Sequence, residues 1–368
     1  MPVPFTDLGR DHAPLRAELV AVFERVLDGG AFVLGPEVDE FERQFAQWLG
    51  VSDVVTVHSG TTALIAAFAA LGVGHGDEVV TVANTFAATV GAVVAVGATP
   101  VVIDVDPATL LLDTTQLDRA MNARTKVVVP VHLYGQVANM EEICDIANRH
   151  GAVVVEDAAQ AHGATWHGRK AGAFGRAACF SFYPGKNLGA LGEAGAVATS
   201  DKALAQRLRR YRNHGGIAKY EHLEPGINGR LSSLQAGLLS VKLRYLDEWN
   251  ACRRRCAARY LAGLTDLPLT LPSVVAPEAH AFHLFVIRTP LRDQLASHLR
   301  QRGIATGIHY PTAVHELPAF ASRVVQACPT PVAEQAAREV LSLPMFGTMT
   351  DVEVDEVIAG VRSFFGDR

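Results

Sequence analysis

The sequence is poor in cysteine and lysine and contains no long uninterrupted apolar run. Its 368 residues include five cysteines, an odd number at scattered positions, which is typical of a reducing compartment rather than of a disulfide scaffold. No basic segment followed by an apolar core opens the sequence, and no apolar run reaches membrane-spanning length without glycine or charge. We therefore expect a cytoplasmic protein that is neither secreted nor inserted into a membrane.

A strong charge of one sign is also absent. The net charge of -5 predicts no general attraction to nucleic acid or to an anionic membrane. Cys252 and Cys256 are four residues apart but have no further ligands nearby, so we predict no metal site. The segment Gly72-Val-Gly-His-Gly-Asp77 follows a predicted helix and ends in Asp, and Gly185-Lys186 is followed by Asn187. Neither matches a dinucleotide or P-loop phosphate motif, which disfavours an NAD-dependent enzyme.

Apolar β-rich runs alternate with helical stretches between residues 60 and 200. Continuous apolar strands separated by helices are typical of a mostly parallel sheet that is covered on both faces. We therefore predict an α/β fold. The predicted strands are 78–82, 100–104, 126–130, 152–156, 177–182 and 195–199.

The chain exceeds the size at which single cores stop growing, so two units are expected. We predict a large domain over residues 1–246 and a smaller C-terminal α/β domain over residues 247–368, on which the N-terminal segment packs. The signals at and after this boundary are a long helix over Ser232–Leu264, prolines 268, 272 and 277, a strand over His283–Arg288 and a helix over Leu291–Arg302.

Lys186 is the strongest candidate for a reactive group. It lies among small and aromatic residues with no other charge before Glu193, whereas the other five lysines lie beside charged or surface-type residues. Such desolvation lowers the pKa of a lysine and favours a neutral, nucleophilic amine. Lys186 is thus a candidate for a Schiff base; the alternative is a surface loop lysine that follows a buried strand.

Two further segments suit a phosphorylated aromatic ligand. Ser59-Gly60-Thr61-Thr62 precedes an alanine-rich helical run and offers N–H groups, hydroxyls and a positive helix end to a phosphate; an ordinary N-cap is the alternative. Asp157 follows a buried strand at the edge where open α/β sheets bind ligands. A carboxylate there can keep a pyridinium nitrogen protonated, or it can simply cap the following turn.

Five other residues are candidates for ligand contacts. Gln160 can donate to a phenolate oxygen, and Ser181 can give a hydroxyl to a phosphate. Phe86 can stack on a flat ring, although a core phenylalanine is the alternative. Asn228 and Arg230 lie in a polar loop that opens the long helix, where they can also be capping residues.

These residues occur in an order that matches a known family. The chain resembles, over nearly its whole length, the sugar aminotransferases of the DegT/DnrJ/EryC1/StrS family, which are pyridoxal-phosphate enzymes of fold type I. The motifs that carry the resemblance are Ser59-Gly-Thr-Thr-Ala-Leu64, Glu156-Asp-Ala-Ala-Gln-Ala-His162, Ser181-Phe-Tyr-Pro-Gly-Lys186-Asn-Leu-Gly and Asn228-Gly-Arg230-Leu.

The resemblance implies a role for each candidate residue. Lys186 would bond to pyridoxal 5'-phosphate and carry the proton, Asp157 would hold the pyridinium nitrogen, Gln160 the phenolic oxygen, and Phe86 would stack on the ring, while Gly60, Thr61 and Ser181 would hold the phosphate. Asn228 would reach the cofactor phosphate of a neighbouring subunit, which implies a homodimer with shared active sites.

The resemblance also implies the reaction. L-Glutamate would give its amino group and leave as 2-oxoglutarate, and a nucleotide-linked keto sugar would take it up. The Lys186 segment is most similar to relatives that act on dTDP-3-keto-deoxyhexoses, so we predict such a substrate and a nucleotide-activated amino sugar as product, for an antibiotic or a surface polysaccharide. A 4-keto sugar nucleotide or a keto-cyclitol is the alternative substrate.

Substrate contacts and a competing class complete the prediction. The loop Gly307–His315 resembles the His-Tyr-Pro loop of relatives that act on nucleotide-linked sugars, so Tyr183, His309 and Tyr310 are expected to contact the sugar, with Arg230 as a further substrate contact. His309 can equally be an interface histidine. A regulatory protein with the same fold is the non-enzymatic alternative, but the chain has no spare length or basic patch for a DNA-binding segment.

Overall fold

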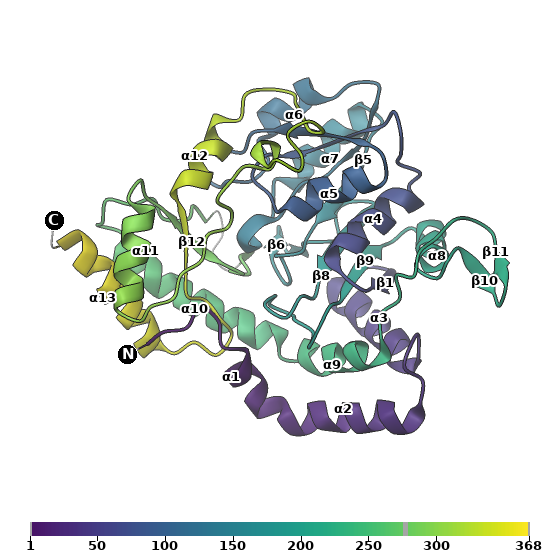
Figure 1. The fold of residues 1–368 in the computed structure, drawn as a ribbon, viewed down its shortest axis with the longest axis horizontal. Helices are drawn as coiled ribbons and strands as arrows, with labels where there is room; N and C mark the ends of the chain where they lie inside the picture. The colour runs from purple at the N-terminus through teal and green to yellow at the C-terminus, as the bar shows by residue number, and fades with distance from the viewer. Residues whose placement is uncertain (1, 275–278, 367–368) are drawn as a thin grey trace.

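Eight strands form one mixed sheet in the computed structural model, which describes residues 2–274 and 279–366 (Figure 1). The strand order is β1-β9-β8-β5-β4-β2-β3-β13. Pro277, one of the three prolines of the predicted boundary, lies outside the described residues. The strands are β1 Asp53–Val57, β2 Glu78–Val82, β3 Thr99–Ile103, β4 Thr125–Val128, β5 Val153–Asp157, β8 Ala177–Ser181, β9 Gly195–Thr199 and β13 Val325–Gln326.

The sheet is parallel from β8 to β13, and β9 runs antiparallel to both β1 and β8. The predicted α/β fold with a mostly parallel sheet is therefore confirmed, and the six predicted strands lie within two residues of the observed ones. The edge strands β1 and β13 were not predicted. β13 has only two residues, too few for a periodic pattern to be recognised.

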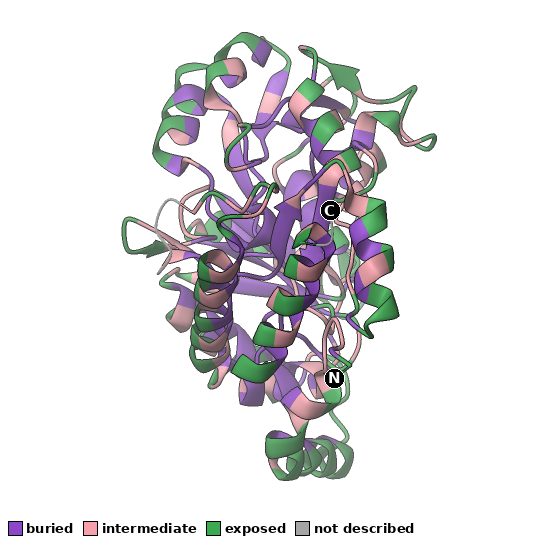
Figure 2. Ribbon diagram, turned by 90° about the vertical axis from the view of Figure 1, so that its left-hand side faces the viewer, coloured by how far each residue is buried: buried purple, intermediate pink, exposed green. Residues whose placement is uncertain are grey.

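Helices cover both faces of the sheet. Successive residues of a strand point to opposite faces, and in these strands the residues on both faces are mostly apolar. Val79 and Val155 belong to a core cluster with α4, α5 and α8, whereas Val80 and Val154 belong to one with α3 and α7. Figure 2 shows the buried strands at the centre and exposed residues on the outer faces of the helices. The helices are α1 Leu8–His12, α2 Arg16–Gly29, α3 Pro36–Leu49, α4 Gly60–Ala70, α5 Ala87–Ala95, α6 Thr114–Ala120, α7 Met140–Arg149, α8 Lys202–Tyr211, α9 Ser233–Leu243, α10 Leu246–Leu264, α11 Arg292–Gln301, α12 Pro331–Glu339 and α13 Asp351–Gly366.

The single long helix predicted over Ser232–Leu264 is wrong. The segment forms two helices, α9 and α10, separated by a turn at Arg244–Tyr245. α9 packs against α2 and α3, whereas α10 packs against α13. The turn lets two apolar faces meet different partners, and a helical periodicity read along the sequence does not reveal such a change.

The C-terminal residues form a second packed unit. β12 (Phe285–Arg288) pairs antiparallel with β14 (Val340–Leu343), and α10, α11 and α13 share an apolar cluster with them. The N-terminal Val3 pairs with Ile304 and belongs to this cluster. However, β13 and α12 come from the same stretch of chain and reach the large sheet, where Asp104 accepts from the N–H groups of Val332 and Ala333. No helix among the described residues is long and apolar enough to cross a bilayer.

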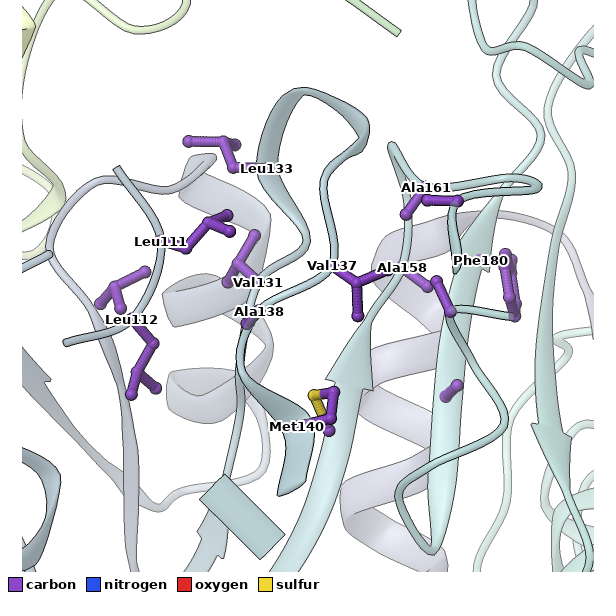
Figure 3. Close-up of a cluster of buried hydrophobic side chains, with 14 of the residues drawn as sticks. Leu111, Leu112, Val131, Leu133, Val137, Ala138, Met140, Ala158, Ala161 and Phe180 are labelled. Carbon is purple, nitrogen blue, oxygen red and sulfur yellow. The ribbon is translucent and has the colours of Figure 1, made fainter. Parts of the chain in front are cut away.

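Buried side chains hold the loops that follow β4 and β5. Figure 3 shows Val131 and Leu133 after β4, and Ala158 and Ala161 after β5 beside Phe180 of β8. All five are at most 5% exposed. Close packing of this kind fixes backbone position, so residues on these two loops are held at defined places along the carboxyl edge of the sheet.

Candidate active site

A cavity of about 570 Å³ lies at the carboxyl edge of the sheet. Its lining includes ten of the twelve residues predicted from the sequence, contributed by β5, β8, α4, the loops after the strands and the C-terminal unit. These ten are Gly60, Thr61, Phe86, Asp157, Gln160, Ser181, Tyr183, Lys186, His309 and Tyr310. Asn228 and Arg230 are not among the lining residues.

Lys186 lies in a tight turn after β8, where its N–H donates to the carbonyl of Tyr183 at 2.8 Å. Burial lowers the pKa of its amine to about 8, against a smaller opposing effect of the Asp157 charge. Roughly a tenth of the amine is then neutral at pH 7, far more than for an exposed lysine. The group is therefore suited to act as a nucleophile and as a proton carrier.

Replacing Lys186 with methionine is expected to stabilise the protein freed of bound small molecules. The folded pKa of about 8 lies below the ordinary 10.5, so the buried ammonium costs stability fully below pH 8, and this cost disappears as the pH rises above the unfolded pKa. The shift corresponds to ~3 kcal/mol at most, and contact with the open cavity reduces this cost. We therefore expect the substitution to raise the free energy of unfolding at pH 7 by about 1–2 kcal/mol, which urea unfolding measures. An equal gain at pH 11, where the lysine is mostly neutral in both states, would contradict this cause.

The start of α4 forms an anion-binding end of the cavity. The Ser59 hydroxyl caps the helix by accepting from the Thr62 N–H at 3.1 Å, so the predicted alternative of an N-cap also holds. The N–H groups of Gly60 and Thr61 have no acceptor in the first helical turn. A Cβ at Gly60 would lie 2.6 Å from the Cβ of Ser181, so only glycine allows the helix start and Ser181 to approach this closely.

Asp157 ends β5 and is 7% exposed. Its Oδ1 accepts from the N–H of Ala159 at 3.2 Å, and its Oδ2 accepts from the hydroxyl of Thr89 at 2.8 Å. The Thr89 hydroxyl also meets that of Thr85 at 2.8 Å. Burial raises the pKa of Asp157, while Thr89, Ala159 and Lys186 act in the opposite direction. A cationic ligand atom beside this carboxyl would favour its ionised form.

Thr89 was missed by the sequence reasoning. It lies in α5 and is fully buried, and 68 residues separate it from Asp157. The only local signal is that two threonines, Thr85 and Thr89, lie on either side of Phe86, where the chain enters α5.

Gln160, Phe86 and Tyr310 line one side of the cavity. The Oε1 of Gln160 accepts from the N–H of Tyr134 at 2.7 Å, and its Nε2 donates to the Tyr310 hydroxyl at 3.1 Å. Phe86 is 53% exposed, with its ring centroid 5.3 Å from that of Tyr310. The alternative that Phe86 is a core residue is therefore wrong, and its ring is accessible to a ligand.

A buried histidine–glutamate pair supports the strand end next to Asp157. The carboxylate of Glu156 lies 2.9 Å from the Nε2 of His132 and accepts from three N–H groups between Gly172 and Gly175. The Nδ1 of His132 accepts from the N–H of Ala138 at 3.2 Å, so the hydrogen lies on Nε2 and is donated to Glu156. Sequence reasoning did not single out either residue.

His309 also lines the cavity. Its Nδ1 lies 2.8 Å from the hydroxyl of Ser342, and its ring stacks on Phe5 with centroids 5.7 Å apart. Burial lowers the pKa of His309 to about 4, so the ring is neutral at pH 7. Tyr183 is 55% exposed at the cavity. The contribution of Phe5, from the N-terminal segment, was not predicted.

Asn228 and Arg230 lie away from the cavity of their own chain. The Nε of Arg230 donates to the Oδ1 of Asn228 at 3.0 Å, and its Nη1 donates to the Oδ1 of Asn213 at 3.3 Å. Asn213 and Asn228 pair across the base of a hairpin, β10 (Gly216–Ala218) and β11 (Glu221–His222), that projects from the body (Figure 1). One chain therefore does not bring these two residues to the other ten.

Comparison with known proteins relates this arrangement to a family of enzymes. A model of the DegT/DnrJ/EryC1/StrS aminotransferase family matches residues 14–362. The chain is 46% identical over 364 residues to the dTDP-3-amino-3,4,6-trideoxy-alpha-D-glucose transaminase of Streptomyces venezuelae, with 98% of this chain and 96% of the relative covered. It is 41% identical over 360 residues to the UDP-N-acetyl-3-dehydro-alpha-D-glucosamine 3-aminotransferase of Acidithiobacillus ferrooxidans, with 98% and 97% covered.

The fold has a similarly close counterpart. The crystal structure of S. venezuelae DesV in complex with a ketimine intermediate superposes on this chain with a TM-score of 0.96 at 46% sequence identity. The superposition covers 99% of this chain and 98% of the other. The likeness therefore includes the N-terminal segment and the C-terminal unit as well as the large sheet.

Proposed function

The chain belongs to the DegT/DnrJ/EryC1/StrS aminotransferase family and is a sugar aminotransferase, and from this premise we propose that it uses pyridoxal 5'-phosphate to move the amino group of L-glutamate to a dTDP-linked 3-keto-deoxyhexose. The predicted family and fold type are confirmed. The observation that carries the proposal is that one cavity holds the Lys186 amine, the buried Asp157 carboxylate and the free N–H groups at the start of α4.

The residues present fit pyridoxal phosphate. The close approach of Gly60 to Ser181 leaves two N–H groups and a hydroxyl for the phosphate, and the exposed ring of Phe86 offers a stacking surface. The carboxyl of Asp157 can keep a ring nitrogen protonated. The Nε2 of Gln160, which donates to the Tyr310 hydroxyl in this structure, can instead donate to a phenolic oxygen of the cofactor. The cofactor, when bound, supplies an electron sink for the carbon that bears the amino group.

Lys186 moves the proton in both halves of the proposed reaction. As a neutral amine it takes a proton from the carbon that carries the amino group of glutamate, and in the second half it returns a proton to the corresponding carbon of the sugar. Its lowered pKa, about 8, keeps both the neutral and the charged form accessible near neutral pH.

The position of the amino group is supported by the names of the two relatives. Both name an amino group at sugar position 3, one on a dTDP sugar and the other on a UDP sugar. We propose Tyr183, His309 and Tyr310 as the sugar contacts, since all three line the cavity. Synthetic dTDP-3-keto, UDP-3-keto and dTDP-4-keto sugars, and a keto-cyclitol, each offered with glutamate, test the assignment. Preferred amination of any substrate but the first, scored by product mass and regiochemistry, overturns it.

We infer that a second copy of the chain completes each site. Helix α2 exposes Phe23 and Leu27 by 51% and 55%, and Leu191, in the loop before β9, is 45% exposed. A groove of about 510 Å³ runs along this apolar face, between α2 and α9, which favours burial against a like surface. No arginine lines the cavity within the described part of the chain, although glutamate and a sugar nucleotide are anionic. We propose Arg230 of a second copy for that role, with Asn228 at the phosphate.

Mixing two inactive variants is expected to restore activity. One variant carries Lys186→Ala, and the other carries both Asn228→Ala and Arg230→Ala. In a mixed dimer one site has both defects and the other has none. When equal amounts dissociate and reassociate at random, about half of the dimers are mixed. The mixture should therefore show about a quarter of wild-type activity. The control is Lys186→Ala mixed with Asp157→Ala, which leaves a defect in every cavity. No recovery in the first mixture, with mixed dimers present, would mean that each chain builds its own site.

We also propose that residues 247–368 form the smaller unit, together with the N-terminal segment. The shared apolar cluster of α10, α11, α13 and Val3 supports this division, whereas β13 extends the large sheet. The boundary then lies at the start of α10, beside the turn that separates it from α9.

A further inference from the structure

Asn187, the residue next to Lys186, takes part in a buried chain of amide hydrogen bonds. Its side chain is 3% exposed. Its Nδ2 donates to the Oδ1 of Asn250 at 2.8 Å and to the carbonyl of Ala281 at 2.9 Å. Because a backbone carbonyl only accepts, the atom that faces Ala281 must be the amide nitrogen. The Oδ1 of Asn187 is therefore left as an acceptor.

Asn250 is oriented in the same way. Its Nδ2 donates to the carbonyl of His162 at 2.8 Å, so its Oδ1 must be the atom that faces Asn187. Two backbone carbonyls, those of Ala281 and His162, thus determine the direction of every hydrogen bond in this chain. The orientation of Asn187 does not depend on an arbitrary choice between its nitrogen and oxygen.

This chain of hydrogen bonds determines the tautomer of His283. The Nδ1 of His283 lies 3.1 Å from the Oδ1 of Asn187. Since that oxygen only accepts, Nδ1 must carry the hydrogen, and a neutral ring then has its lone pair on Nε2. The guanidinium of Arg253 holds the same backbone by donating to the carbonyls of Phe282 and His283, both at 3.2 Å.

The lone pair of His283 is available inside the cavity. The ring lines the cavity and is 9% exposed, and Nε2 has no hydrogen-bond partner within residues 2–274 and 279–366. Burial, followed by the charges of Lys186 and Arg253, lowers the pKa of His283 well below its ordinary value. The ring is neutral at pH 7, so the acceptor is present under working conditions.

We propose that His283 is a positioning residue for Lys186, whose ammonium donates a hydrogen bond to the Nε2 of His283 whenever the amine carries the transferred proton. This inference rests on the proposed function, in which Lys186 is the reacting amine. Lys186 is the donor that fits, because it lines the same cavity and adjoins the residue that orients the ring. Because one of its three hydrogens is donated to His283, the ammonium holds the other two in fixed directions.

Several of the other ionisable groups near the pair are already engaged or deeply buried. Asp157 is the acidic group whose charge acts on Lys186, and its oxygens already accept from Thr89 and Ala159. His309 uses its Nδ1 toward Ser342. His162 is fully buried, with its pKa lowered to about 3, and the Nη1 of Arg253 is occupied by carbonyls.

Two substitutions separate the acceptor role from structural support of Asn187. In His283→Asn, the amide nitrogen takes the place of Nδ1 and nothing replaces Nε2, so the bond to Asn187 is kept and the cavity acceptor is lost. In His283→Gln, the amide group reaches the place of Nε2, so an acceptor is kept and the bond to Asn187 is lost. The two roles therefore predict opposite orders of damage.

The first measurement needs no turnover. The chain has six lysines, so carbon NMR of ε-labelled lysine in the cofactor-free protein can follow Lys186, assigned with Lys186→Ala. Its midpoint, about 8 in the wild type, is expected to fall by about one pH unit in His283→Asn and to change little in His283→Gln. With pyridoxal phosphate bound, kcat is expected to fall roughly tenfold or more in His283→Asn, with the KM for glutamate unchanged.

The proposal would be overturned if the titration midpoint of Lys186 and kcat were unchanged in His283→Asn but lowered in His283→Gln. The ring would then serve only as a structural support for Asn187. Nitrogen NMR of histidine in the unsubstituted protein, which avoids any folding defect of a variant, gives a second test. A hydrogen on Nε2 of neutral His283, assigned through loss of its signal in either variant, would also overturn it. Failure of the proposed function is distinguishable, because Lys186→Ala would then keep its turnover whatever the His283 variants do.

Discussion

Replacing Lys186 with alanine is expected to abolish turnover and the visible absorbance that pyridoxal phosphate gives when it is bonded to a lysine. The variant loses both the group that bonds to the cofactor and the group that moves the proton, so turnover should fall by roughly 10⁴-fold or more. Absorbance spectra of the purified protein and an end-point assay of the amino sugar check the two losses separately. An active Lys186→Ala enzyme is incompatible with the proposed function.

Borohydride reduction of the loaded wild-type enzyme, followed by peptide mapping, identifies the bonded lysine. Lys242 is a demanding internal control, because burial also lowers its pKa to about 8. However, its Nζ donates to the carbonyl of Gly189 and lies 2.8 Å from the Nε2 of His12, and it does not line the main cavity. We expect the label on Lys186 alone, and a label on Lys242 would transfer the role to that residue.

Replacing Asp157 with asparagine is expected to lower kcat/KM by roughly 10²–10³-fold, comparable to removal of one preorganised charge-stabilising group. The neutral amide keeps the shape of the carboxylate but no longer favours a protonated ring nitrogen. Steady-state kinetics with saturating cofactor measure the loss. Thr89→Val keeps the carboxylate and removes one of its hydrogen bonds, so a smaller loss, about tenfold, is expected. Equal losses in the two variants would mean that the charge itself is unimportant.

The same Asp157→Asn substitution should stabilise the cofactor-free protein at neutral pH. Burial raises the folded pKa of Asp157 above its unfolded value, so its contribution to stability is present below the unfolded pKa and is lost as the pH rises through the folded pKa. Asparagine removes this loss. We expect a rise in Tm of about 2–4 °C, and the opposite changes in activity and stability would identify Asp157 as a group maintained for catalysis.

Sequence reasoning placed correctly the segments whose signal is local. The apolar strands of the sheet, the polar start of α4, Asp157 at the end of β5 and Lys186 after β8 each belong to a short continuous segment. The chemistry of such a segment is visible in its own neighbours along the chain. Because parallel strands expose their carboxyl ends at one edge, the convergence of these residues could also be expected.

Reasoning from the sequence failed where a contact joins distant segments. Thr89 reaches Asp157 across 68 residues, and His283 reaches Asn187 across 96. Phe5 joins the cavity because the N-terminal segment crosses to the C-terminal unit. The break between α9 and α10 likewise depends on which helices each half packs against. None of these features leaves a periodic pattern or a motif in the sequence.

The sequence by itself determined which groups can do chemistry, because residue type and immediate surroundings decide whether a lysine is desolvated or a helix start is free to bind an anion. Only the tertiary structure decided which protonation state and which hydrogen-bond direction each of them has. Those properties depend on burial and on partners such as Thr89, Asn187 and the carbonyl of Ala281, and such partners come into contact only when the chain packs.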